Sequence, residues 1–188
     1  MKNADDLIVR AGGGFPRRVA SRGAPSVALW RGRALSCALG RAGVTAAKRE
    51  GDGATPRGRW PMREVLYRPD RLRRVETALP CRALRENEGW CDEPSDPGYN
   101  RRVLLPYRAH SEKLWREDGL YDLVVPLGYN DDPVMPGRGS AIFLHLARED
   151  FAPTEGCVAL SLADLLLVLS EARPGSAVLI GQEPARGE

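Results

Sequence analysis

The sequence predicts a mainly β protein with a few short helices, folded as a single domain of residues 1–188. Short apolar runs separated by Gly and Pro recur along the chain, which is typical of strands joined by turns. A length of 188 residues fits one domain whose core is large enough to fold without disulfides. The hydrophobic content of 43% excludes a globally disordered chain.

The first part of the chain contains four expected strands. Residues 7–10, 26–30 and 35–39 are short runs rich in apolar and β-branched side chains, and 60–67 is a fourth. Arg31-Gly32-Arg33 separates the second run from the third, and this predicts a β-hairpin.

The middle of the chain, from about residue 69 to 139, is rich in Pro and Gly and has little periodicity. Residues 111–118 are expected to form a short helix capped by Ser111, and the apolar run 120–127 is expected to form a buried strand. Long ordered loops in a compact domain usually carry function, so this region is a candidate for substrate contacts.

The last fifty residues contain the clearest elements. Residues 141–146 predict a central strand, and 155–160 predict a turn that enters a short strand. The capping box at 161–164 opens a helix to about Ala172, and 176–180 form the final strand.

Several classes of protein are disfavoured by the composition. The longest strongly apolar run is 165–169, far short of the roughly 20 residues that cross a bilayer. The first residues carry no basic and apolar export signal, so a cytoplasmic location remains an alternative. Arg makes up 25 of the 28 basic residues, which raises the possibility of a nucleic-acid-binding β module. The interspersed acidic residues and the 6% aromatic content favour a bias in codon composition instead, with no nucleic-acid partner.

The cysteines argue against a metal site. The four cysteines form no C-x-x-C pair and the chain has only two histidines, so no metal is expected. Cys81 and Cys91 are close enough in sequence for a disulfide, but two unpaired thiols are the favoured interpretation.

His145 and Cys157 are the candidate catalytic pair. The histidine lies at the end of an apolar strand, and the cysteine follows Gly156 at a turn twelve residues later. An imidazole that takes the thiol proton gives a strong nucleophile, and the N–H groups of Gly156 and Cys157 could face a developing oxyanion. The alternative is a small core cysteine with a hydrogen-bonded histidine. His110 is a competing base, but its polar surroundings predict that it is exposed.

These residues resemble the catalytic signature of the YkuD-type L,D-transpeptidases. The signature is a His after a hydrophobic strand followed by Ser-x-Gly-Cys-[Ile/Val], and the chain has His145 and then TEGCV at 154–158. Upstream, the segment GATPRGRW at 53–60 is similar to the Thr-Pro-x-Gly turn of the family. Three further strings resemble a compact branch of the superfamily: GWCD at 89–92, YNR at 99–101 and LGYNDD at 127–132. The resemblance covers about residues 48–180, and 1–47 are expected to supply N-terminal strands of the same domain.

The resemblance implies a β-sandwich or barrel-like domain that catalyses acyl transfer without a metal or organic cofactor. Cys157 would attack a peptidoglycan stem peptide, His145 would act as base and acid, and the amides of Gly156 and Cys157 would bind the oxyanion. Thr154 and Glu155 would lie beside the substrate. The implied ligands are stem peptides and carbapenem-type β-lactams, and the implied location is the periplasm or cell envelope.

Two departures from the family pattern concern the pocket. Glu155 stands where His or Ser is usual, and Ala159 stands where the family has Arg. The donor preference is therefore expected to differ more than the Cys–His chemistry. An L,D-carboxypeptidase or amidase that uses water as acceptor is the alternative function, and a catalytically silent wall-binding protein is a further one.

The middle region supplies the remaining candidate substrate-binding residues: Trp90, Asp92, Asn100, Asn130 and Arg138. An aromatic face, a carboxylate and two amides could hold a stem peptide, and an arginine could pair with its carboxylate. The alternative is that the Asp and Asn residues cap turns and that the Trp packs in the core.

Overall fold

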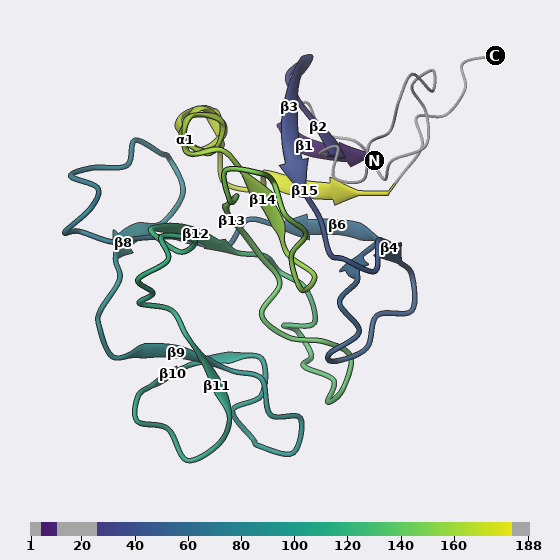
Figure 1. The fold of residues 1–188 in the computed structure, drawn as a ribbon, viewed down its shortest axis with the longest axis vertical. Helices are drawn as coiled ribbons and strands as arrows, with labels where there is room; N and C mark the ends of the chain where they lie inside the picture. The colour runs from purple at the N-terminus through teal and green to yellow at the C-terminus, as the bar shows by residue number, and fades with distance from the viewer. Residues whose placement is uncertain (1–4, 11–25, 182–188) are drawn as a thin grey trace.

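The computed structural model describes residues 5–10 and 26–181, and its main feature is a curled sheet of ten strands that forms a half-barrel (Figure 1). In spatial order the strands are β6 (Gly58–Pro61), β15 (Ala177–Ile180), β1 (Asp6–Arg10), β2 (Ser26–Trp30), β3 (Arg33–Ala38), β14 (Val158–Leu160), β13 (Phe143–Leu146), β12 (Leu123–Pro126), β7 (Val65–Tyr67) and β8 (Cys81–Ala83). The expectation of a mainly β fold is confirmed.

Two smaller sheets accompany the large one. The strands β10 (Arg101–Leu104), β9 (Glu88–Cys91) and β11 (Ser111–Lys113) form one of them, with β9 in the centre. The other pairs β4 (Val44–Thr45) with β5 (Thr55–Pro56).

The expected hairpin in the N-terminal part is confirmed. Strands β2 and β3 pair antiparallel, and Trp30 lies opposite Arg33. Arg31 and Gly32 form the turn with φ values of 46° and 83°, the left-handed conformation that two-residue hairpin loops require.

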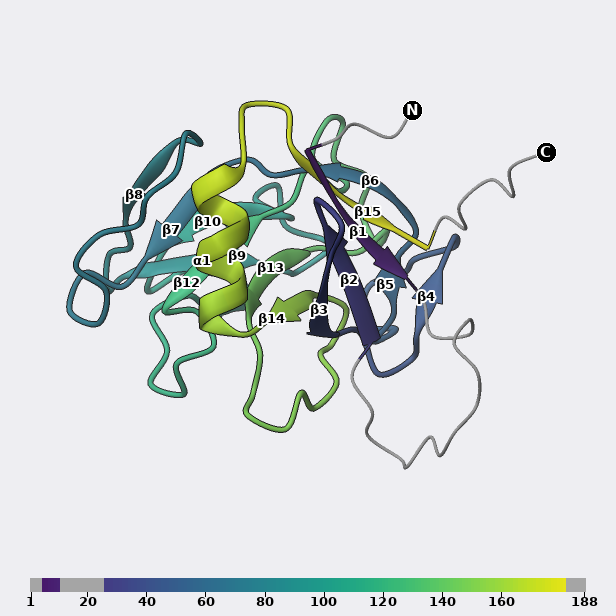
Figure 2. The same ribbon diagram turned by 90° about the horizontal axis from the view of Figure 1, so that it is seen from above.

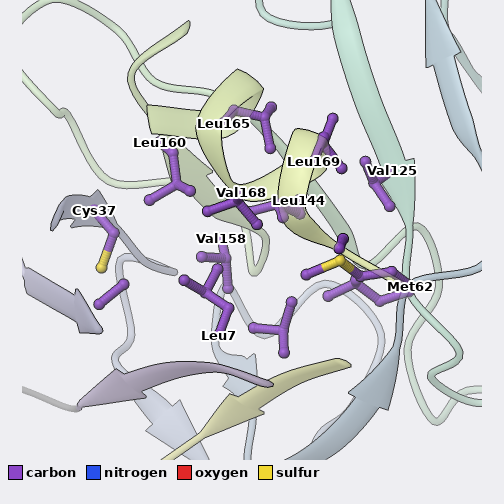
Figure 3. Close-up of a cluster of buried hydrophobic side chains, with 14 of the residues drawn as sticks. Leu7, Cys37, Met62, Val125, Leu144, Val158, Leu160, Leu165, Val168 and Leu169 are labelled. Carbon is purple, nitrogen blue, oxygen red and sulfur yellow. The ribbon is translucent and has the colours of Figure 1, made fainter. Parts of the chain in front are cut away.

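The helix α1 (Leu162–Glu171) covers one face of the sheet. Ser161 is its N-cap and accepts a hydrogen bond from the Asp164 N–H, as the capping box predicts. Leu165, Val168 and Leu169 are buried on the strands, and Figure 3 shows them among side chains of the sheet. In Figure 2 the helix lies between β7 and β8 on one side and β1 to β3 on the other.

A second apolar cluster lies on the opposite face of the sheet. Leu144 and Val158 belong to the core under α1, whereas Phe143 and Cys157 belong to the second cluster. Successive side chains on a strand point to opposite faces, which explains this division. The three-stranded sheet lies on the side of β12 to β14 away from α1 (Figure 1).

Three expectations for secondary structure are wrong. Residues 111–118 form no helix, because 111–113 pair with β9 as β11 and the buried Leu114 follows. The expected strand 60–67 is two strands, β6 and β7, which pair with β15 and β12 respectively. The expected strand 120–127 is shorter, because the Asp122 N–H bonds to the Gly119 carbonyl in a turn before β12 begins.

The cysteines are all unpaired. Cys37, Cys81, Cys91 and Cys157 are free thiols, so the structure contains no disulfide between Cys81 and Cys91.

Candidate functional site

Cys157 and His145 lie on the same face of two paired strands. Strands β13 and β14 are parallel, with Leu144 opposite Val158 and His145 opposite Ala159. Cys157 is one step before β14, so by the alternation of side chains it shares the face of Ala159 and of His145. This face is the one turned away from α1.

The turn before the cysteine is held by Thr154. The Thr154 hydroxyl accepts a hydrogen bond from the Gly156 N–H at 3.2 Å and donates one to the Cys157 carbonyl at 2.7 Å. Gly156 has φ 140°, and a Cβ there would lie 2.8 Å from the Ala54 carbonyl oxygen. Only glycine therefore fits this position, because the neighbouring backbone occupies the space of a side chain.

The Cys157 thiol is buried and hydrogen-bonded to backbone. The Phe143 N–H donates to Sγ at 3.3 Å, and the S–H donates to the Ala141 carbonyl at 3.2 Å. Burial, together with the negative charge of Glu112, raises the pKa of Cys157 to about 12. The resting group is therefore a neutral thiol at neutral pH.

His145 is buried on the same face of the sheet, as a neutral imidazole. Its Nδ1 lies 2.8 Å from the Leu146 carbonyl oxygen, which can only accept, so Nδ1 carries the proton and Nε2 is the acceptor. Burial, together with the positive charge of Arg116, lowers the pKa of His145 to about 4. The Tyr121 ring packs edge-on against the imidazole, with centroids 5.2 Å apart.

A cavity of about 340 Å³ contains both candidate catalytic side chains. Cys157 and His145 are part of its wall, which also contains apolar residues and charged residues of both signs. The charged lining residues are Lys48, Glu50, Asp92, Glu112, Arg116, Arg148 and Glu155.

Two polar networks line this cavity. In the first, Glu112 accepts a hydrogen bond from the Tyr121 hydroxyl at 2.7 Å and lies 3.4 Å from Arg116. Burial raises the pKa of Glu112. In the second, Glu50 accepts hydrogen bonds from Ser140, at 2.7 Å, and from Tyr99.

Three of the residues predicted to bind substrate line the cavity. Thr154 is one of them and also holds the turn. Glu155 is exposed and forms an ion pair with Arg41 at 2.8 Å. Asp92 lies 2.6 Å from Nδ1 of His110, whose side chain is exposed as expected.

The other four predicted residues are not part of the cavity wall: Trp90, Asn100, Asn130 and Arg138. The Asn130 amide donates to the carbonyls of Met135 and Gly139. The Trp90 indole N–H donates to Asn100, and its ring packs edge-on against Phe143. The Arg138 carbonyl accepts a hydrogen bond from the Tyr129 hydroxyl.

Several residues of the cavity wall were missed from the sequence: Lys48, Glu50, Glu112, Arg116, Tyr121 and Ser140. Glu112 and Arg116 were assigned to a short helix, so nothing suggested that they would be half-buried in a cavity wall. The sequence held a weak indication that these two residues lie near the core, because both come just before the apolar run 120–127.

Metal ligation and membrane crossing have no support in the described residues. Within 5–10 and 26–181, no three His, Cys, Asp or Glu side chains are grouped so that they could hold a metal ion. Over the same part of the chain, no helix has both the length and the apolar character needed to span a bilayer.

Comparison with protein families identifies the chain. The model of the YkuD L,D-transpeptidase catalytic domain matches residues 22–180. The chain therefore belongs to this family of catalytic domains, and the match begins further toward the N-terminus than the motifs suggested. No curated protein compared with the chain matches it.

Proposed function

We propose that the protein is a cysteine acyltransferase, an L,D-transpeptidase that cross-links peptidoglycan through a thioester on Cys157. One observation carries the proposal: in a chain of this family, Cys157 and His145 share one sheet face and one cavity. Gly156 belongs to the same turn. The family supports stem peptides as substrates and the cell envelope as the place of action.

The first half-reaction forms the thioester. Sγ attacks the carbonyl carbon of the amide after the third residue of the stem, and the thiol proton passes to Nε2 of His145. The C–N bond then breaks, and the proton from Nε2 leaves on the amine of the terminal D-residue. An amide has been exchanged for a thioester with no other reactant.

The second half-reaction resolves the thioester. The amine of a neighbouring stem attacks the acyl carbon and gives a proton to Nε2, and the C–S bond breaks. Sγ takes the proton back as the thiol, and a new amide joins the two stems. Water in place of the amine would make the enzyme a carboxypeptidase.

The resting protonation states favour general-base catalysis over a preformed ion pair. A thiol with a pKa of about 12 and an imidazole with a pKa of about 4 are both neutral at neutral pH. Proton transfer therefore accompanies the attack of sulfur. The Phe143 N–H, which already donates to Sγ, stabilises the negative charge that develops there.

The test is intact mass after incubation with a carbapenem, for the wild type and for Cys157→Ala. We expect one adduct on the wild type and none on the variant. The variant keeps Cys37, Cys81 and Cys91, so these three thiols are internal controls for reaction at other cysteines. An adduct of equal size on both proteins, or on neither, would contradict the assignment of Cys157.

Product analysis with stem peptides decides the acceptor. The enzyme is incubated with a tetrapeptide alone and, separately, with the tetrapeptide and a second stem that carries a free amine. With the second stem present, we expect a cross-linked dimer and the released D-amino acid. Release of the D-amino acid without any dimer would replace the transpeptidase with the hydrolase.

A further inference from the structure

Asn100 is buried, at 5% exposure, and its side-chain amide joins three separate segments of the chain. Its Oδ1 accepts hydrogen bonds from the Trp90 indole N–H at 2.9 Å and from the Ala141 N–H at 3.1 Å. Its Nδ2 donates to the carbonyls of Tyr129 at 3.0 Å and Asn130 at 2.8 Å. Both donors and both acceptor positions of the amide are therefore used within the protein.

Two of these four partners, Asn130 and Ala141, have a positive φ, and Ala141 is the one whose side chain does not favour it. Ala141 has φ 51°, a left-handed conformation that residues with a Cβ rarely adopt. Such a conformation persists only where neighbouring contacts impose it. The Asn100 amide supplies one such contact, because it accepts the hydrogen bond of the Ala141 N–H.

The other end of the same residue contacts the candidate nucleophile. The Ala141 carbonyl accepts the S–H of Cys157 at 3.2 Å, and two residues later the Phe143 N–H donates to the same sulfur. The conformation of residues 141–143 therefore determines where Sγ lies and where its proton points.

We infer that Asn100 is a positioning residue for the Cys157 thiol and that it acts through the backbone of Ala141. The inference rests on the proposed function of Cys157. It gives Asn100 a role other than contact with substrate, because its amide has no hydrogen-bonding capacity left for a ligand and it lies outside the cavity wall.

The test compares Asn100→Gly with Asn100→Asp by the kinetics of carbapenem acylation. Position 100 has φ 53°, so Gly removes the amide without adding backbone strain. Asp keeps an oxygen acceptor for Trp90 and Ala141, and its second oxygen, when protonated, can donate to the Tyr129 or Asn130 carbonyl in place of Nδ2. For Asn100→Gly we expect the limiting rate of acylation at saturating carbapenem to fall on the order of ten- to a hundredfold. The concentration for half-maximal rate and the final adduct stoichiometry should stay as in the wild type, and Asn100→Asp should recover most of the rate.

A purely structural role would give a different pattern. Loss of folded protein lowers the fraction of enzyme that forms an adduct and leaves the rate constant of the folded fraction unchanged. Val168→Ala is the matched control, because it removes buried methyl groups under α1, on the other face of the sheet. It should lower the melting temperature and leave the rate of acylation unchanged.

The outcomes separate this inference from the proposed function. A wild-type protein that forms no adduct at Cys157 contradicts the proposed function. If the wild type reacts, two results would overturn the role of Asn100 alone. One is an Asn100→Gly variant that reacts as fast as the wild type, and the other is an Asn100→Asp variant that reacts as slowly as Asn100→Gly. If Asn100→Gly does not fold, Asn100→Ser serves in its place, because a serine hydroxyl is too short to replace the amide.

Discussion

At the scale of single residues, the site is defined by two groups that burial keeps neutral. Cys157 is 7% exposed and His145 is 5% exposed, and both interact with backbone groups of the sheet. A charged form of either group would lose most of its hydration, so both groups are neutral in the resting protein.

The first prediction concerns the pH dependence of stability. Burial lowers the pKa of His145 from 6.5 to about 4, so the unfolded chain binds a proton in this range that the folded protein does not. The free energy of unfolding therefore falls as pH falls from about 6.5 to 4, by about 3 kcal/mol from this group. Urea unfolding at a series of pH values measures it.

The control for this prediction is His145→Gln, which cannot titrate. Other acidic groups contribute to acid unfolding in both proteins, so the difference between the two pH profiles isolates His145. Parallel profiles between pH 6.5 and 4 would show that His145 titrates normally in the folded protein.

At the scale of elements, the strand order explains which side chains meet. The parallel pairing of β13 with β14 places Cys157 and His145 on one face, and α1 covers the other. The helix stabilises these two strands from behind, because Leu165, Val168 and Leu169 pack in the same core as Leu144 and Val158.

The second prediction concerns the start of this helix. Ser161→Ala removes the hydroxyl that accepts from the Asp164 N–H, and we expect a loss of about 1 kcal/mol in the free energy of unfolding. Ser170→Ala is the matched control, because Ser170 is exposed near the end of the same helix and donates only to the Leu167 carbonyl. Thermal unfolding that ranks the control as the more damaging change would refute the cap.

Some elements could be predicted from residues close in sequence, and others could not. The hairpin at Arg31 and Gly32 and the helix after Ser161 depend on residues close in sequence, and both were predicted. Residues 111–118 had a cap-like serine and charged residues, but 111–113 are an edge strand of a sheet whose centre is β9. The conformation of such a segment is determined by pairing with a strand about twenty residues away, and intrinsic secondary-structure propensity does not reveal this pairing.

At the scale of the whole molecule, the sheet is held in its curled shape by the chain between β6 and β7. These strands are neighbours in sequence but lie at or near opposite ends of the ten-strand order. Between them the Met62 N–H donates to the Ser176 carbonyl and the Arg63 N–H donates to the Pro126 carbonyl, both at 3.0 Å. Met62 and Arg63 therefore form hydrogen bonds near both ends of the strand order. The two ends can meet at this segment only if the sheet curls.

The third prediction tests an ion pair at the β6 end of this sheet. Asp6 of β1 is fully buried, and both of its oxygens lie 2.8 Å from Arg59 of β6, across the intervening β15. Asp6→Asn leaves the guanidinium with a weaker partner, and we expect a loss of roughly 3 kcal/mol in the free energy of unfolding. Chemical denaturation measures this loss.

The control for this ion pair is the neighbouring residue. Asp5 pairs with Arg31, and both side chains are partly exposed, so Asp5→Asn should cost less than about 1 kcal/mol. Equal effects of the two substitutions would contradict a special role for the buried pair.

The sequence by itself determined the mainly β class, the hairpin, the capped helix and the residue types of the candidate pair. The sequence also singled out Gly156, and the structure gives a packing reason for a glycine there: the Ala54 carbonyl fills the space of a Cβ. These features depend on local patterns, which a linear sequence displays directly.

The tertiary structure decided the cavity and the state of the thiol. Lys48 comes from a segment far in sequence from Glu112 and Tyr121, and the packing of the fold brings all three to the cavity that Cys157 lines. The same packing buries the sulfur and raises the pKa of Cys157, and it turns Asn100 from an apparent ligand-binding amide into a buried support of Ala141. Burial and long-range contacts depend on which segments meet in space, so these properties belong to the fold and are not visible in any single stretch of the chain.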